Sequence, residues 1–148
     1  MDDLDNIDRN MLAILQSDGR ITVTDLAQKV GLSKTPCLVR MRRLEERGIV
    51  KGYGAIIDPE RVDLGHIAFV QVSLSDTRSE ALADFNDRIA AISEIEECHM
   101  IAGNFDYLLK VRSRNIGAFR RFLGETLSIL PHVARTSTFI VMEAVKDR

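Results

Sequence analysis

The sequence predicts an α+β protein in two parts, a helical part over residues 1–65 and a mixed part over residues 66–148. Two observations support this division. Up to about residue 48, apolar residues recur at helical spacing, as in Leu38, Met41 and Leu44. After residue 66, short runs with period-two alternation are interleaved with helical stretches. The order of the later runs is β-α-β-β-α-β, which is the arrangement of a ferredoxin-like sandwich.

Composition narrows the class of protein. The chain has 148 residues, and 45% of them are hydrophobic, which is enough for a globular core and too many for a disordered chain. No apolar run approaches the roughly 20 residues of a membrane span. The N-terminal residues are acidic and include no apolar segment, so we expect no secretory signal, no membrane contact and a cytoplasmic location.

Metal and cofactor chemistry have no support in the sequence. The two cysteines are far apart, and we expect free thiols. The cysteines and histidines show no zinc-ligand spacing: Cys37, Cys98, His66, His99 and His132. Nucleophile–base pairs and phosphate loops are also missing from the pattern, so an enzyme is disfavoured.

The first helix is expected to begin after Asp5 or Asn6, either of which can act as N-cap. Asp8 falls in its first turn, and Asp18-Gly19 ends it. Its buried stripe consists of Ile7, Met11, Ile14 and Leu15.

Two further helices follow, joined by a tight turn. Thr24 is a candidate N-cap for the first of them, and Gly31 suits the left-handed conformation that ends a helix. Ser33 or Thr35 can cap the next helix, and Pro36 suits its first turn because the missing N–H would be unpaired there.

The third helix has an apolar face and a basic face. Arg40, Arg43 and Arg47 recur on the side away from Leu38, Met41 and Leu44. Between Ser33 and Tyr53 there are six basic and two acidic residues, a local charge of +4 in a chain of net charge -2. A basic helix after a Gly-containing turn is typical of a helix-turn-helix recognition helix, although a solvated charged face explains the same pattern.

The segment that follows closes the helical part. Gly48 ends the third helix, and residues 49–57 read as extended, forming either a small wing or a linker strand. Asp58-Pro59 marks a turn, and residues 61–65 form a polar joint where the domain boundary is expected.

The second part contains four predicted strands and two predicted helices. The strands are expected at 67–74, 95–102, 105–112 and 136–145, and the helices at 80–92 and 115–130, with Ile116 inside. Tyr107, Leu109 and Val111 alternate with Asp106, Lys110 and Arg112, which places the first set inward. One face of such a sheet is open, and another copy of the chain is its expected cover.

Specific motifs connect the chain with a known family. They include Ser33-Lys-Thr-Pro-Cys37, Gly48-Ile-Val-Lys-Gly-Tyr53 and Gly103-Asn-Phe-Asp-Tyr107. With these motifs, the chain resembles the Lrp/AsnC family of bacterial transcription factors over nearly its whole length. The resemblance implies a winged helix-turn-helix domain, a ferredoxin-like effector domain, double-stranded DNA as partner, and homodimers that assemble to octamers or larger. The family residues that correspond to a DNA-binding surface are Ser33, Lys34, Thr35, Pro36, Cys37, Arg40 and Arg43.

The resemblance also implies a free amino acid as effector, with leucine first and proline or another branched-chain amino acid next. Its ammonium needs a carboxylate, for which Asp106 is the natural candidate. Its carboxylate suits backbone N–H groups of the Gly103-Asn104 turn. Further contacts are expected from Met100, Ile116, Tyr107, Thr136 and Thr138. The alternative function is an architectural DNA-wrapping protein with little effector response.

Overall fold

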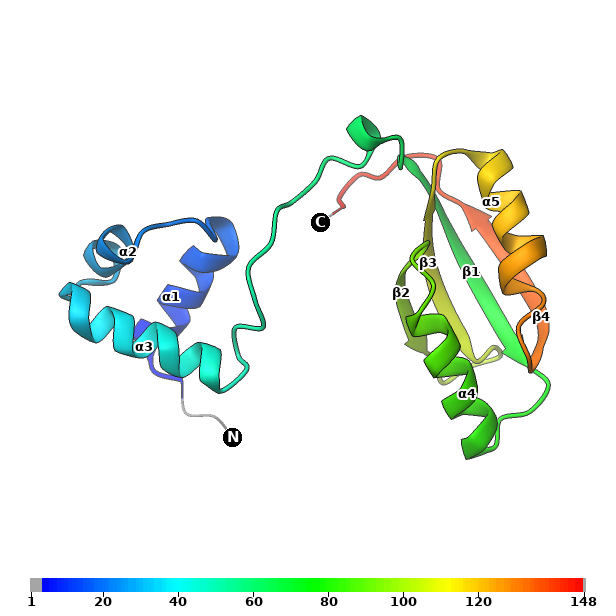
Figure 1. The fold of residues 1–148 in the computed structure, drawn as a ribbon, viewed down its shortest axis with the longest axis horizontal. Helices are drawn as coiled ribbons and strands as arrows, with labels where there is room; N and C mark the ends of the chain where they lie inside the picture. The colour runs from blue at the N-terminus through cyan, green and yellow to red at the C-terminus, as the bar shows by residue number, and fades with distance from the viewer. Residues whose placement is uncertain (1–3, 148) are drawn as a thin grey trace. The chain divides into compact units, whose positions relative to one another are not determined.

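The computed structural model describes residues 4–147, so the first residues of the acidic N-terminal segment lie outside the described part. The chain divides into two compact units between Ile56 and Ile57. The sequence placed the joint a few residues later, at 61–65. Figure 1 shows a helical unit and a unit in which helices pack on a sheet.

The first unit contains three helices, α1 (Asn6–Ser17), α2 (Val23–Val30) and α3 (Lys34–Glu46). Asp5 caps α1 in a reciprocal arrangement in which Asp8 N–H donates to Asp5 and Asp5 N–H donates to Asp8. Met11, Leu26, Ala27 and Cys37 form the core of this unit.

The N-cap of α2 is Thr22, whose hydroxyl accepts from Asp25 N–H, so the prediction of Thr24 was wrong. The helix begins earlier because Thr22 and Asp25 stand at the three-residue spacing that a cap requires, and Val23 turns inward. Gly31 has φ of 72°, the left-handed conformation expected for the end of α2.

The extended segment after α3 forms neither strand nor helix within described residues 49–57. A strand needs a second strand to pair with, and the described residues of this unit form only helices besides this segment and its loops. The start of the segment is held instead by Ile49 and Val50, whose N–H groups both donate to Leu44 O. Further along, the Tyr53 hydroxyl donates to Glu45 at 2.8 Å. Burial and the Glu45 carboxylate together raise the pKa of Tyr53 to about 12.

The second unit begins with a short 3-10 turn, Glu60–Val62, and then has the predicted β-α-β-β-α-β order. The strands are β1 (His66–Leu74), β2 (Ile95–Met100), β3 (Tyr107–Ser113) and β4 (Val133–Ile140). They form one antiparallel sheet in the order β2-β3-β1-β4. The helices are α4 (Ser79–Ala90) and α5 (Ile116–Phe122), and α5 continues into a π-helical turn, Leu123–Leu127.

Both helices of this unit cover the same face of the sheet (Figure 1). The predicted alternation is confirmed, because Tyr107, Leu109 and Val111 are buried against Phe85 and Phe119. Ile116 was predicted inside but is 58% exposed. It is the first residue of α5, directly after the N-cap Asn115, and the buried residues of α5 are Phe119 and Phe122.

Candidate functional site

The start of α3 is an accessible part of the helix-turn-helix. Ser33 is its N-cap, although the Ser33 side chain makes no capping hydrogen bond within the described chain. Pro36 lies in the first turn, as predicted. The side chains of Ser33, Lys34, Thr35 and Pro36 are all exposed. This end of α3 can therefore approach a partner closely.

The buried face of α3 is centred on Cys37 and Leu44, both of which have no exposed surface. The prediction that Cys37 contacts DNA was wrong, because its thiol packs in the core with Met11 and Leu26. Burial also raises the pKa of the Cys37 thiol. The outward face is centred instead on Val39, which is 60% exposed.

Arg40 and Arg43 lie between these two faces and contact α1. Arg40 Nη1 donates to Asp5 Oδ2 at 2.6 Å and to Asp8 Oδ1 at 2.9 Å. Arg43 Nη2 donates to Asp8 Oδ2 at 2.6 Å. The Asp8 side chain has no exposed surface. We call these four residues the α1–α3 clamp.

The electrostatics of the clamp are mutually stabilising. The backbone N–H of Asp8 and the Arg40 guanidinium lower the pKa of Asp5, and the two carboxylates raise the pKa of Arg40. The expected wholly outward basic face is thus incorrect for Arg40, whose side chain is only 25% exposed. Val39 and Arg42, both exposed, were missed as outward residues. A helical wheel centred on Cys37 would have found them.

Some of the predicted ligand residues of the second unit lie close together, around the turn that contains Gly103 and Asn104. Asp106 Oδ2 accepts from Leu74 N–H at 2.7 Å, and Asp106 N–H donates to Val72 O at 2.9 Å. These bonds hold the turn that contains Gly103 and Asn104 against the end of β1. Gly103 and Asn104 themselves are exposed.

Met100 and Tyr107 lie beside this turn but line a groove between α4 and β2. The groove has a volume of about 360 Å³ and is also lined by Asn86, Ile89 and Cys98. The Tyr107 hydroxyl is already used, since it donates to Asn86 Oδ1 at 2.8 Å. Burial raises the pKa of both the Tyr107 hydroxyl and the Cys98 thiol.

Thr136 and Thr138 do not join Met100 within one chain. They lie on β4, which is the opposite edge of the sheet from β2. Thr136 pairs with Val72, which also pairs with Tyr107, so Thr136 is two strands away from Tyr107. Within one chain the seven predicted ligand residues therefore do not form a single cluster, because these two threonines lie at the far edge of the sheet.

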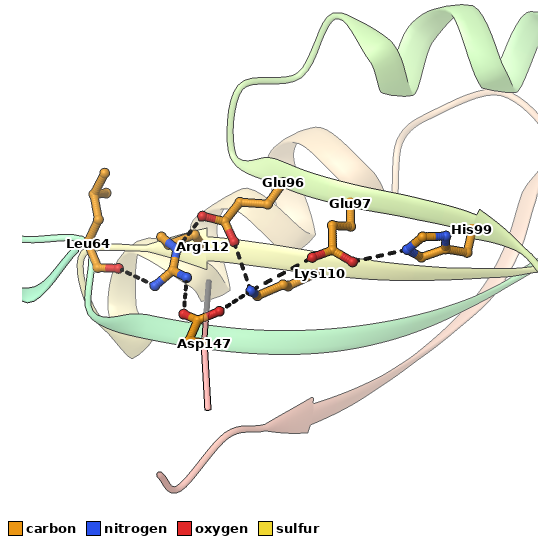
Figure 2. A network of polar contacts seen from close by, with 7 residues as sticks. All are labelled: Leu64, Glu96, Glu97, His99, Lys110, Arg112 and Asp147. Atoms are coloured by element: carbon orange, nitrogen blue, oxygen red, sulfur yellow. Dashed lines mark hydrogen bonds and ion pairs between the residues drawn. The ribbon is translucent and has the colours of Figure 1, made fainter. Parts of the chain in front are cut away.

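A charged network occupies the other face of the sheet (Figure 2). Lys110 and Arg112 lie on the strand face opposite Tyr107, Leu109 and Val111, as the alternation predicts, yet they are only 8% and 9% exposed. Asp147 bridges them, with 2.6 Å from Lys110 Nζ to Oδ1 and 2.6 Å from Arg112 Nη2 to Oδ2. Glu96 pairs with both cations, and Arg112 Nη1 donates to Leu64 O at 3.2 Å. We call Glu96, Lys110, Arg112 and Asp147 the tail anchor.

Charge pairing dominates the tail anchor. The hydrogen bonds from Lys110 and Arg112 lower the pKa of Asp147 to about 2, and the bond from Lys110 has the larger effect. Burial raises the pKa of Glu96, but its bonds to Arg112 and Lys110 outweigh that effect and the net pKa is lowered. Sequence reasoning missed this network because its carboxylates come from β2 and from the end of the chain.

Residues 4–147 give no support for a metal site or for a membrane-spanning helix. This part of the chain contains no group of three or more His, Cys, Asp or Glu side chains placed to hold a metal ion. Within the same described residues, no helix combines the length and the apolar character needed to cross a membrane.

Comparison with known proteins defines the class. Residues 4–51 match the family model for winged helix-turn-helix DNA-binding, and residues 67–148 match the model for the Lrp/AsnC ligand binding domain. The chain is a DNA-binding transcriptional regulator with a separate ligand-binding domain, and its relatives are regulators rather than enzymes.

Individual relatives cover almost the entire chain. A proline dehydrogenase transcriptional activator of Rhizobium radiobacter is 53% identical, covering 99% of this chain and 94% of the relative. The leucine-responsive regulatory protein of Escherichia coli K12 is 48% identical, covering 98% and 88%. A Neisseria meningitidis transcriptional regulator solved in complex with L-Met superposes with a TM-score of 0.92 at 35% identity, covering 98% and 94%. The chain belongs to the Lrp/AsnC family.

Proposed function

We propose that this chain regulates transcription in response to a free aliphatic amino acid, with leucine and proline as the first candidates. The observation that carries the proposal is the near full-length similarity to regulators named for leucine and for proline dehydrogenase, at 48% and 53% identity. The neighbour solved with L-Met supports an amino acid as the class of ligand.

The chemistry around Asp106 suits the ammonium group of such a ligand. One carboxylate oxygen of Asp106 accepts from Leu74 N–H, while Oδ1 accepts no hydrogen bond from residues 4–147. Oδ1 can therefore accept from an ammonium group in a charge-assisted bond. The exposed backbone at Gly103 and Asn104 supplies N–H donors for the carboxylate of the same ligand.

We further propose that the site is completed by a second copy of the chain. Thr136 and Thr138 are too far across the sheet to meet Met100 in one chain. A homodimer that assembles into octamers or larger would supply them from another subunit and would place two recognition helices on one DNA. Size-exclusion chromatography with light scattering tests this part of the proposal, and a monomer at micromolar concentration would contradict it.

A thermal-shift screen of free amino acids tests the effector. A ligand that binds only the folded chain stabilises it by about 2.7 kcal/mol at one hundred times its Kd. We expect L-leucine or L-proline to raise the melting temperature and D-leucine to have no effect. If no amino acid binds at millimolar concentration, the architectural alternative is favoured.

Asp106→Asn separates the structural role of this residue, which is to hold the turn, from its proposed role in binding the ammonium group. The amide oxygen of Asn can still accept from Leu74 N–H, so the turn should keep its structure, but the charge that holds the ammonium is gone. We expect the thermal shift to be lost and DNA binding without effector to remain. Glu143→Gln, which removes an exposed carboxylate elsewhere in the unit, is the matched control. An unchanged thermal shift in Asp106→Asn would exclude Asp106 from the site.

A further inference from the structure

We infer that Asp8 is a positioning residue that orients Arg43 on the recognition helix, and that Arg40 serves the clamp rather than DNA. This inference depends on the proposed function, because it assigns roles within the DNA-binding surface. It starts from the complete burial of the Asp8 side chain. Both oxygens of its carboxylate accept from arginines of α3.

Arg40 is committed to α1. Its Nη1 atom is shared by two carboxylates, at 2.6 Å from Asp5 and 2.9 Å from Asp8, and its side chain is 25% exposed. A DNA phosphate that approached Arg40 would have to compete with two carboxylates already in contact. Removing Arg40 should therefore remove no phosphate contact.

Arg43 is less committed to α1. It contacts one carboxylate rather than two, with Nη2 at 2.6 Å from Asp8, and its side chain is 45% exposed. The guanidinium is rigid and planar, so holding Nη2 on Asp8 restricts where the other two nitrogens can lie. Nε and Nη1 of Arg43 donate to no group among residues 4–147, so they can contact a phosphate or a base edge while Asp8 holds Nη2.

The clamp also limits the charge that α3 presents. The segment from Ser33 to Tyr53 carries +4, and including Asp5 and Asp8 lowers the local charge to +2. Sequence-independent DNA binding scales with the number of phosphates that cations neutralise. The two aspartates should therefore weaken binding to random DNA while they sharpen binding to a preferred sequence.

The salt dependence of DNA binding distinguishes the two arginines. The probes are a duplex enriched from a randomised pool by the wild-type protein and a scrambled duplex of the same composition. We expect Arg43→Ala to reduce the slope of log Kobs against log salt concentration by about 0.9, the contribution of one phosphate contact. We expect Arg40→Ala to leave that slope unchanged, although affinity falls.

The role of Asp8 is tested with Asp8→Asn. If Asp8 positions Arg43 and neutralises Arg40, affinity for the scrambled duplex should rise while the ratio of specific to non-specific affinity falls about tenfold. A general loss of structure would lower both affinities, so the rise is diagnostic. Asp25→Asn, which makes the same charge change on α2 at a side chain bonded to Thr22, is the control and should leave the ratio unchanged.

Asp5→Asn is a second variant of the clamp, and it tests the same inference if Asp8→Asn does not fold. Asn is as good an N-cap as Asp, so α1 should stay capped while Arg40 loses one of its two carboxylates. We expect tighter binding to the scrambled duplex here as well. The inference is overturned if Arg40→Ala reduces the slope as much as Arg43→Ala does, or if the aspartate variants lower both affinities together. A wild-type chain that binds no duplex would instead refute the proposed function.

Discussion

The tail anchor gives a quantitative prediction, because two ion pairs hold Asp147 against the sheet. Asp147 contacts Lys110 and Arg112, whereas Met142 and Val145 in the segment that leads to it are 100% and 90% exposed. Asp147→Asn keeps the shape of the side chain and removes its charge. We expect this substitution to destabilise the second unit.

The magnitude follows from the pKa of Asp147. A pKa lowered from 3.8 to about 2 corresponds to at most about 2.4 kcal/mol of stabilisation at neutral pH. The Asp147 side chain is 24% exposed, so solvent screening reduces this value. We expect a loss of about 1 kcal/mol in the free energy of unfolding.

Urea unfolding of the full chain, followed by far-UV circular dichroism, measures this loss. The folded pKa lies below the unfolded one, so the contribution is present above pH 3.8 and disappears as the pH falls toward 2. The difference between wild type and Asp147→Asn should therefore shrink below pH 4 and also at high salt.

Glu143→Gln is the control for the tail anchor, since Glu143 is exposed in the same segment and has no ion pair among residues 4–147. It should match the wild type within experimental error. If Asp147→Asn also matches the wild type at pH 7, the ion pairs do not stabilise the unit and the reasoning is wrong.

Three further predictions concern packing and the DNA-binding surface. Phe85→Ala should cost about 3–5 kcal/mol in urea unfolding, because Phe85 is fully buried between α4 and the sheet. Gly31→Ala should cost about 1 kcal/mol, since φ of 72° strains any residue with a Cβ; a loss no larger than that of Gly54→Ala, at a glycine with open space around it, would contradict this. Val39→Asp should weaken gel-shift binding at least tenfold without changing stability, because Val39 projects 60% exposed from α3; unchanged binding would exclude Val39 from the DNA-binding surface.

The order of elements was predictable because it depends on local signals. Asp5 and Asp8 stand at the spacing of a reciprocal cap, and the alternation of Tyr107, Leu109 and Val111 gives one strand face directly. Gly31 marked the end of α2 because few other residues adopt its conformation. Such signals act over a single turn or a short strand, so they are visible without knowledge of the fold.

The candidate site was less predictable, because helical periodicity alone does not fix which residue lies at the centre of the buried face. The wheel was centred on Leu38, Met41 and Leu44, and this choice turned Arg40 outward. The core selects Cys37 instead, since it faces Met11 and Leu26 on the two preceding helices. Centring the buried face of α3 on Cys37 places Val39 at the centre of the outward face and Arg40 at its border.

The ion pairs that the sequence did not predict share one physical property: their partners are distant along the chain. Asp8 and Arg43 are 35 residues apart, as are Arg112 and Asp147, and Lys110 and Asp147 are 37 apart. Local patterns assign a charge to solvent because an unpaired buried charge is too costly. That reasoning fails wherever the fold brings an opposite charge from elsewhere, so charged residues that border a buried stripe are where a sequence-based surface needs experimental testing.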